Sequence, residues 1–237
     1  TRSRNVMRRQ RFRLDSGGKI DRTRPLTFTF NGRRYGGYAG DTLASALLAN
    51  GVHFTGRSFK YHRPRGILSA GVEEPNALVQ HGKGARSDPN TRATILALYD
   101  GLRAASQNCW PGLHVDIGAL NGWLSALIPA GFYYKTFMRP ARLWRAYEYV
   151  IRQAAGLGRA PDAPDPDRYA HRHAHCDVLV VGAGPAGLAA AMAAGASGAR
   201  VILADEQGEF GGALLSDGGG PVAIGDAPPA AFAARAR

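Results

Sequence analysis

The stretch that decides the fold is Cys176-Asp-Val-Leu-Val-Val-Gly-Ala-Gly-Pro-Ala-Gly187, followed by an alanine-rich run and a second apolar segment that ends at Asp205-Glu206. Residues 178–181 form a continuous, mostly β-branched apolar run, which predicts a strand buried on both faces of a parallel sheet. Residues 188–196 predict a helix, and residues 201–204 predict a second buried strand. This order predicts an α/β fold that begins with the first βαβ unit of a Rossmann-like domain.

The three glycines of this stretch have the G-x-G-x-x-G spacing of dinucleotide-binding loops. Gly182 allows a tight turn, Gly184 lets the backbone approach a pyrophosphate, and Gly187 lets the helix pack closely on the strand. The pyrophosphate would then lie at the helix N-terminus, where backbone N–H groups favour an anion. A glycine-rich turn that only packs remains the alternative.

An acidic residue, Asp205, follows Gly187 by 18 positions, where a carboxylate can accept hydrogen bonds from an adenosine ribose. Gln207 is neutral, and no arginine follows Asp205 closely enough to neutralise a 2′-phosphate. The pattern therefore favours NAD or FAD over NADP.

Composition limits the classes of protein that need to be considered. The 237 residues allow one large or two modest domains, and the two cysteines, Cys109 and Cys176, argue against a disulfide framework. We therefore expect a reducing compartment and a cytoplasmic location, with Cys109 as a buried thiol and not a nucleophile. No apolar run approaches the ~20 residues that span a bilayer, so we expect no membrane. The arginine-rich start also resembles a mitochondrial transit peptide, which is the alternative location.

The positive charge is concentrated near the start of the sequence. Residues 1–66 hold 15 of the 30 Lys and Arg residues but 3 of the 18 Asp and Glu residues, so the remainder holds 15 of each. Nucleic-acid binding is one explanation, but the segment shows no known RNA-binding signature. An acidic partner subunit or an anionic cofactor explains the charge at least as well, so we expect no nucleic-acid partner.

The N-terminal half has the order of elements of a β-grasp domain. Residues 26–30 alternate as a half-buried strand, Asn31-Gly32 predicts a hairpin turn, and residues 34–38 predict the return strand. Thr42 is a candidate N-cap for a helix over residues 43–48 that Asn50-Gly51 ends. Residues 94–99 are a further strand candidate.

This half resembles the small ferredoxin-like domain attached to bacterial amine and opine oxidoreductases, on the hairpin, the Gly40-Asp41-Thr42 helix start and Arg63-Pro-Arg-Gly66. In cluster-bearing relatives the following loop supplies cysteines spaced C-x4-C-x2-C. The matching positions here are Ser69, Glu74 and Ala77, and none can replace a thiolate of a [2Fe–2S] cluster. The resemblance implies a ferredoxin-like scaffold without a cluster.

Over residues 12–215 the sequence resembles the alpha subunits of heterotetrameric sarcosine oxidases. The blocks that carry this resemblance are Gln107-Asn-Cys-Trp-Pro111, Asp116-Ile-Gly-Ala-Leu-Asn121, Pro129 to Met138, Arg152 to Pro161, Asp165 to Tyr169, Ala174 to Asp177 and Glu209-Phe-Gly-Gly212. The resemblance implies a bound NAD, contacted by Gly182, Gly184, Ala186, Gly187, Asp205, Glu206, Gln207 and, less securely, Ala213. The residues themselves show no convincing general acid/base constellation and no second cluster of metal ligands, so we expect no catalytic residue and no metal ligand in this chain.

For the complete enzyme, the resemblance implies oxidative demethylation of sarcosine to glycine with formation of hydrogen peroxide. FAD and FMN would lie mainly on the partner subunit, tetrahydrofolate would accept the one-carbon unit at a C-terminal domain absent here, and the partners would be beta, gamma and delta subunits. The alternatives are the alpha subunit of a related opine, cyanide-forming or N-methylglutamate oxidoreductase, and a non-catalytic scaffold that holds the subunit interface.

The expected domain organisation has four parts. These are a basic arm (1–24), a ferredoxin-like β-grasp domain (25–104), a connecting helical and aromatic segment with a linker (105–174), and the truncated start of a Rossmann-like NAD-binding domain (175–237). In the linker, His171, His173 and His175 alternate; a metal site is conceivable, but a solvated linker is the favoured interpretation. The aromatic residues between 132 and 149 predict core or interface packing, with stacking on a flavin as the alternative.

Overall fold

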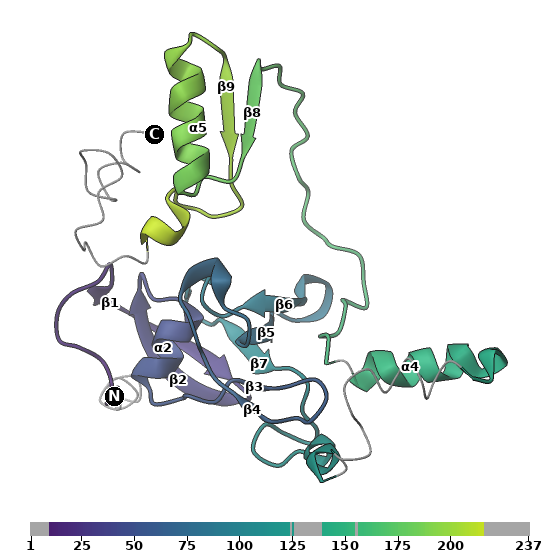
Figure 1. Cartoon of the computed structure of the whole chain (residues 1–237). Helices are drawn as coiled ribbons and strands as arrows, with labels where there is room; N and C mark the ends of the chain where they lie inside the picture. The colour runs from purple at the N-terminus through teal and green to yellow at the C-terminus, as the bar shows by residue number, and fades with distance from the viewer. Residues whose placement is uncertain (1–9, 124, 126–138, 155, 216–237) are drawn as a thin grey trace. The chain divides into compact units, whose positions relative to one another are not determined.

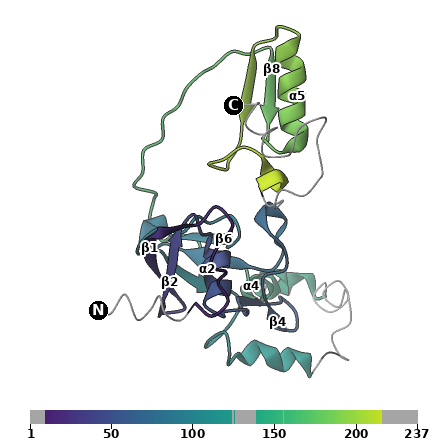
Figure 2. The same cartoon turned by 90° about the vertical axis from the view of Figure 1, so that its left-hand side faces the viewer.

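The computed structural model describes residues 10–123, 125, 139–154 and 156–215. The chain divides into two compact units, which are described separately (Figures 1 and 2). Unit 1 comprises residues up to Ser69 together with Glu74–Pro166, and unit 2 comprises Ala70–Glu73 and the residues from Asp167 onward. The expected connecting segment therefore belongs largely to unit 1.

A five-stranded mixed sheet forms the centre of unit 1 (Figure 1). Its strands, in spatial order, are β2 (Arg33–Ala39), β1 (Asp21–Phe30), β7 (Arg103–Ser106), β5 (Leu78–His81) and β6 (Asp88–Arg92). β1 and β7 are parallel, and the other neighbours are antiparallel. Strand β7 thus lies between the β1–β2 and β5–β6 hairpins and is parallel to β1. With one helix packed on β2, this is the β-grasp arrangement predicted from the sequence.

The predicted first hairpin is confirmed, because Asn31 and Gly32 both have positive φ angles, 48° and 76°, as a type I′ turn requires. The alternation along β1 buries Phe28 and Phe30, which are 1% and 2% exposed. β1 begins at Asp21, so the sheet starts before residue 25.

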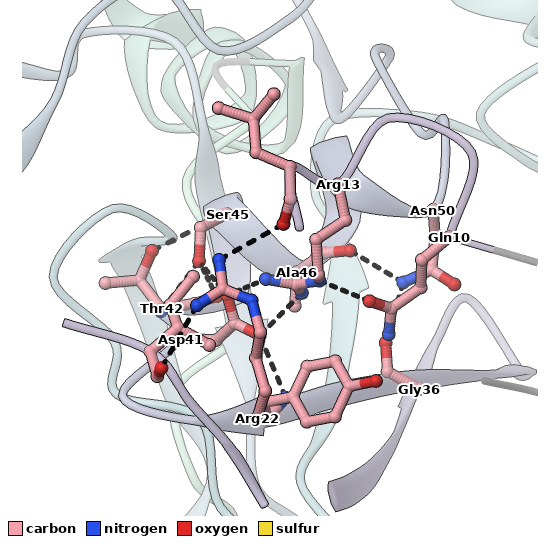
Figure 3. A network of polar contacts seen from close by, with 12 residues as sticks. Gln10, Arg13, Arg22, Gly36, Asp41, Thr42, Ser45, Ala46 and Asn50 are labelled. Atoms are coloured by element: carbon pink, nitrogen blue, oxygen red, sulfur yellow. Dashed lines mark hydrogen bonds and ion pairs between the residues drawn. The ribbon is translucent and has the colours of Figure 1, made fainter. Parts of the chain in front are cut away.

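The helix α2 (Leu43–Ala49) begins and ends where the sequence predicts (Figure 3). Thr42 and Ser45 form a capping box, and the buried Asp41 accepts the hydroxyl of Ser45 and the backbone N–H of Tyr38. Arg13 donates to both oxygens of Asp41, at 3.1 and 2.7 Å. Arg13 therefore docks the middle of the basic arm on its own domain, while residues 1–9 lie outside the described residues.

The strand predicted over residues 94–99 is wrong; this segment is a series of turns with one bridge, between Ala97 and Thr42. Its backbone instead serves the start of α2. The carbonyl of Leu96 accepts the N–H of Leu43, and that of Ala93 accepts the N–H of Ala44. These bonds satisfy N–H groups that have no partner within the helix, which a strand in the sheet would leave unpaired.

The core of unit 1 lies between the sheet and α2 and contains Phe28, Phe30, Leu43, Leu47, Val79 and Leu102. Cys109 is half-buried and packs against this core. The short strands β3 (Gly56–Arg57) and β4 (Pro64–Arg65) form a separate hairpin, and α4 covers Trp144–Ala154. The short 3-10 helices among the described residues are Gly71–Glu73, Gly84–Arg86, Ile117–Gly122, Ala141–Leu143 and Gly212–Leu215. Within the described residues, no helix has the length and apolar character needed to cross a membrane.

The expected packing of the aromatic segment is tested at few positions. Trp144 and Tyr149 are 48% and 64% exposed on α4, so neither is a core residue of unit 1. Phe132, Tyr133, Tyr134 and Phe137 lie outside the described residues.

In unit 2, β8 (Val178–Val181) and β9 (Val201–Ala204) are parallel neighbours joined by α5 (Pro185–Ala196) (Figure 1). Val178 pairs with Val201 and Val181 with Ala204, so both strands end at the same edge. At the opposite edge, the backbone N–H and the guanidinium of Arg200 donate to the carboxylate of Asp177.

The expected burial of β8 on both faces is wrong for the described residues. Leu179 and Val181 are 59% and 80% exposed, while Val178 and Val180 are partly covered. The reason is that α5 lies on one face of the two strands and no other described element covers the second face. The sequence pattern correctly marks an apolar strand, but the covering layer is not among the residues described.

Candidate functional site

The glycine loop follows β8 at the edge where both strands of unit 2 end. The N–H of Gly182 donates to the carbonyl of Ala204 at 2.8 Å, which continues the β8–β9 pairing into the turn. Gly182 has a φ of +100°, a conformation that side chains rarely adopt. The tight turn predicted at this glycine is therefore present.

Gly187 and Gly184 differ in what surrounds them. A Cβ atom added at Gly187 would lie 1.8 Å from the carbonyl oxygen of Gly182, so only glycine allows α5 to approach the loop this closely. A Cβ atom at Gly184 would meet no heavy atom within 4 Å. Gly187 therefore serves packing, whereas Gly184 leaves space beside the backbone.

The N-terminus of α5 has no side-chain cap. Gly184 is the N-cap residue and Pro185 is the first helical residue, so the first backbone N–H groups of the helix belong to Ala186 and Gly187. The N–H of Leu188 already donates to the carbonyl of Gly184 at 2.9 Å. Uncapped N–H groups and the helix dipole make such an end suitable for an anion.

Asp205 links the end of β9 to the glycine loop. Its Oδ2 accepts the N–H of Ala183 at 2.5 Å, and its Oδ1 accepts the N–H of Gln207 at 2.7 Å. These two hydrogen bonds lower the pKa of the Asp205 carboxyl, against a smaller opposing effect of burial. The group is therefore ionised at neutral pH, and each oxygen retains a lone pair for a further donor.

The remaining predicted contacts lie around this edge. Glu206 is exposed next to Asp205, and Gln207 turns back toward it through its backbone. Ala213 lies in the turn Gly212–Leu215, and a Cβ atom at Gly212 would be 3.0 Å from the Cα of Gly184. The structure therefore brings the segment of Ala213 to the glycine loop.

Sequence reasoning did not find how the segment after Gln207 is held. The N–H of Gly211 donates to the carbonyl of Ala183 at 2.8 Å, and Leu214 is buried against Ala183 and Leu188. The signal that pointed here was the Glu209-Phe-Gly-Gly212 block, in which Gly211 and Gly212 both have positive φ angles.

A second loop that concentrates backbone N–H groups lies in unit 1, around Glu74. The four N–H groups of Leu68, Ser69, Asn76 and Ala77 all donate to its carboxylate, at 2.7 to 3.1 Å. Glu74 is 1% exposed. Burial alone raises the pKa of this carboxyl, but the four hydrogen bonds outweigh it and the pKa is lowered. Glu74 is therefore a buried, fully satisfied anion.

The histidines of the linker do not form a metal site among the described residues. No group of three His, Cys, Asp or Glu side chains there is placed to hold a metal ion, and His171, His173 and His175 are exposed.

The chain is similar in sequence to curated alpha subunits of sarcosine oxidases. It is 65% identical over 207 residues to sarcosine oxidase subunit alpha from Rhizobium meliloti (strain 1021), a match that covers 87% of this chain and 21% of the relative. The resemblance to sarcosine oxidase alpha subunits is confirmed. The alpha subunit from Corynebacterium sp. (strain U-96) is 39% identical over 86% of the chain and 17% of its own length. The chain thus spans about a fifth of the length of the sarcosine oxidase alpha subunits it matches.

Two family models match this chain, one within unit 1 and one within unit 2. Residues 23–109 match a 2Fe-2S iron-sulfur cluster binding domain, which confirms the ferredoxin-like domain, and residues 177–230 match an FAD dependent oxidoreductase family. A solved structure of L-proline dehydrogenase from P. horikoshii aligns over 85% of the chain and 27% of its own, with a TM-score of 0.41 and 18% identity, which is too distant to inform the fold.

The residues of unit 1 do not fit a [2Fe–2S] cluster. Such a cluster is held by four thiolates, in some centres with two replaced by histidine, and residues 23–109 contain one cysteine, Cys109. The loop of Glu74 is also closed, because its N–H groups are already bound to that carboxylate. The expectation of a ferredoxin-like scaffold is therefore consistent with the side chains present.

Proposed function

We propose that this chain is the NAD-binding portion of a sarcosine oxidase alpha subunit. The observation that carries the proposal is the shared edge of unit 2, where an uncapped helix N-terminus, an open Gly184 and an ionised Asp205 lie together. This edge has one set of donors suited to a pyrophosphate and one acceptor suited to a ribose.

Each predicted contact has a defined task in this proposal. The N–H groups of Ala186 and Gly187 bind the pyrophosphate, and Gly182 and Gly184 keep the loop free of side chains. Asp205 accepts a ribose hydroxyl with the lone pairs that Ala183 and Gln207 leave. Glu206, Gln207 and Ala213 border the adenosine half of the ligand. β8, α5 and β9 are then the first βαβ unit of a Rossmann-like domain.

The match to an FAD dependent oxidoreductase family supports a dinucleotide in general. NAD and FAD share the ADP moiety that these residues would bind, so the described edge is suited to either. The neutral Gln207 and the absence of a nearby arginine favour both over NADP, and we propose NAD on the resemblance to the sarcosine oxidase alpha subunits.

For the complete enzyme, we propose oxidative demethylation of sarcosine to glycine in the cytoplasm, with hydrogen peroxide formed and the one-carbon unit passed to tetrahydrofolate. FAD and FMN would lie mainly on a partner subunit, and the partners would be beta, gamma and delta subunits. Within this chain we propose domain boundaries near residues 24, 104 and 174. The name of the relatives, subunit alpha, supports an assembly of several chains.

The test is the identity and occupancy of the nucleotide released when the full-length alpha subunit, purified with its partners, is denatured. We expect NAD in stoichiometric amount. Bound FAD on the alpha subunit without NAD would overturn the choice of cofactor and favour an opine-type relative. Absence of any nucleotide would overturn the dinucleotide site itself and leave the glycines with a packing role.

A scaffold role is the second candidate, and the closed loop of Glu74 favours it for unit 1, because that loop holds a carboxylate where its domain family holds a redox cluster. In this proposal the nucleotide stabilises the fold and unit 1 contributes to a subunit interface. An Asp205→Ala variant of the assembled enzyme separates the two roles. Loss of NAD with sarcosine turnover retained would support the scaffold role, and loss of both would contradict it.

A further inference from the structure

A cavity of about 330 Å³ opens in unit 1 beside the β3–β4 hairpin. One wall is the hairpin itself, residues 56–65, and the other is formed by residues 75–78 and 107–108. Four cationic side chains line it, from Arg57, Lys60, Arg63 and Arg65, and none of the described residues in its lining is acidic. The cavity is therefore strongly basic.

Buried hydrogen bonds hold the hairpin in place. The guanidinium of Arg57 donates to the carbonyls of Leu113 and His62, at 2.8 and 2.7 Å, and lies 3.4 Å from the carboxylate of Asp116. The amide of Asn108 donates to the backbone carbonyls of Arg57 and Ser58, at 3.2 and 2.8 Å. These contacts of Arg57 and Asn108 fix the position of the hairpin wall.

His62 fixes the tip of the hairpin from behind. Its Nδ1 lies 2.6 Å from Asp116 Oδ2, and its φ of +49° reverses the chain between β3 and β4. A Cβ atom at Gly118 would lie 2.2 to 2.6 Å from the ring of His62, so the ring packs directly on that glycine. A residue with positive φ that is held by a hydrogen bond to the buried Asp116 indicates that the conformation of this turn is specified.

The charges at the tip are arranged around an aromatic ring. The ammonium of Lys60 lies 4.8 Å from the centre of the Tyr61 ring, and the guanidinium of Arg63 lies 5.0 Å from it. Arg65, on β4, is exposed at the same cavity. The neighbouring Phe59 is 55% exposed and offers a second aromatic face.

We propose that this cavity binds a small phosphorylated ligand with an aromatic ring, of the size of a mononucleotide. Guanidinium groups match phosphate oxygens in a bidentate geometry, and the exposed ring of Phe59 provides a face for stacking. The volume lies in the range of small-molecule sites, and a concave, ordered wall suits a small ligand better than a protein segment. All lining residues belong to unit 1, so the site is separate from the edge of unit 2.

The test uses pyridoxal 5′-phosphate, an aromatic phosphate with an aldehyde, on the full-length alpha subunit assembled with its partners. If the phosphate binds in the cavity, the amine of Lys60 condenses with the aldehyde to an imine with loss of water. Borohydride then delivers hydride to the imine carbon and makes the label permanent. Peptide mass spectrometry measures labelling at Lys60 against Lys19 and Lys83, which do not line the cavity.

We expect Lys60 to be labelled about tenfold more than Lys19 and Lys83, and excess AMP to protect it. The double variant Arg63→Gln/Arg65→Gln should lose this preference. The charge-matched control Arg11→Gln/Arg24→Gln, at exposed positions outside the cavity, should keep it. An Asp205→Asn background should leave the labelling unchanged, which separates this site from the dinucleotide proposal.

Three results would overturn the proposal. Equal labelling of Lys60, Lys19 and Lys83 would show that the cavity has no preference for the probe. Labelling that the Arg63/Arg65 variant leaves unchanged would show that those cations do not bind the phosphate. Protection by an acidic peptide but not by AMP would identify the cavity as a docking site for a protein segment. Retained secondary structure and melting temperature in both double variants ensure that a loss of labelling reports on binding.

Discussion

The loop of Glu74 in unit 1 and the loop of Gly182 in unit 2 both gather backbone N–H groups, but they treat them in opposite ways. In the first, four N–H groups are bound to one buried carboxylate of the same chain. In the second, Asp205 accepts one N–H of the glycine loop, from Ala183, and a second from Gln207, while the start of α5 has no side-chain cap. A domain-family resemblance predicts a ligand site at both loops, and only the second leaves donors for one.

The difference shows that an N–H-rich loop is a candidate anion site only after its internal acceptors are counted. Glu74 provides a full negative charge with both oxygens satisfied by neighbouring amides, so a ligand would have to displace it at high cost. Asp205 accepts the N–H of Ala183 and does not cap the N-terminus of α5. The substitutions below are designed to close the open loop or to open the closed one.

The largest effect is expected for Gly187→Ala. The added Cβ would lie 1.8 Å from the carbonyl oxygen of Gly182, so α5 must move away from β8. We expect a loss of about 3 kcal/mol of stability and of the bound nucleotide. Chemical denaturation and nucleotide content of the full-length subunit measure this. The control Gly195→Ala meets nothing within 4 Å and should stabilise α5 by up to about 1 kcal/mol.

The next effect is expected for Glu74→Gln, which places an amide NH₂ against backbone donors. We expect unit 1 to lose about 2–3 kcal/mol, because buried N–H groups are left without a charged acceptor. Hydrogen exchange should accelerate at residues 68, 69, 76 and 77 and remain slow in the β1–β2 hairpin. Glu73→Gln, at the exposed neighbouring position, should change stability by less than about 0.5 kcal/mol. Equal effects of the two substitutions would contradict the assigned role of Glu74.

Asp205→Asn should weaken the nucleotide more than the fold. An amide oxygen can still accept the N–H of Ala183, but the charge that binds a ribose hydroxyl is lost, so we expect about 10–100-fold weaker NAD binding. Titration calorimetry on the apo alpha subunit measures the change. Asp177→Asn, at the opposite edge of the two strands, should leave NAD affinity unchanged.

The smallest effect concerns pH. Because the pKa of Glu74 in the folded chain lies below its ordinary value of 4.5, its stabilising contribution is complete above that value and disappears as the pH falls through the lower, folded pKa. The difference in unfolding free energy between the wild type and Glu74→Gln should therefore be constant from pH 7 to about 5 and shrink below about 4.5. A difference that grows on acidification would contradict an ionised Glu74.

Much of the fold could be predicted from local signals. Asn31-Gly32, the Thr42 cap and the Asn50-Gly51 end each specify a backbone conformation through their own chemistry, and all three are found as predicted. Gly182 and Gly187 were assigned tasks that depend on neighbouring backbone alone, and the space around them matches those tasks.

The errors arose where the outcome depends on distant contacts. Residues 94–99 have the apolar character of a strand, yet the carbonyl of Leu96, together with that of Ala93, accepts an N–H at the start of α2, about 50 residues earlier in the chain. β8 reads as buried on both faces, but burial is decided by a covering layer that its own residues do not encode. Glu74 was recognised as a replaced ligand position, but its four amide partners are visible only in the folded loop.

The carboxylate at the centre of the Glu74 loop also changes what the cell must supply to make this domain. A cluster-bearing ferredoxin fold matures only after iron and sulfide have been delivered to it. Here the charge that organises the loop is a side chain of the polypeptide itself, buried and bound by backbone N–H groups. Because the anion that organises this loop belongs to the chain, the hydrogen bonds of the loop form without delivery of iron or sulfide.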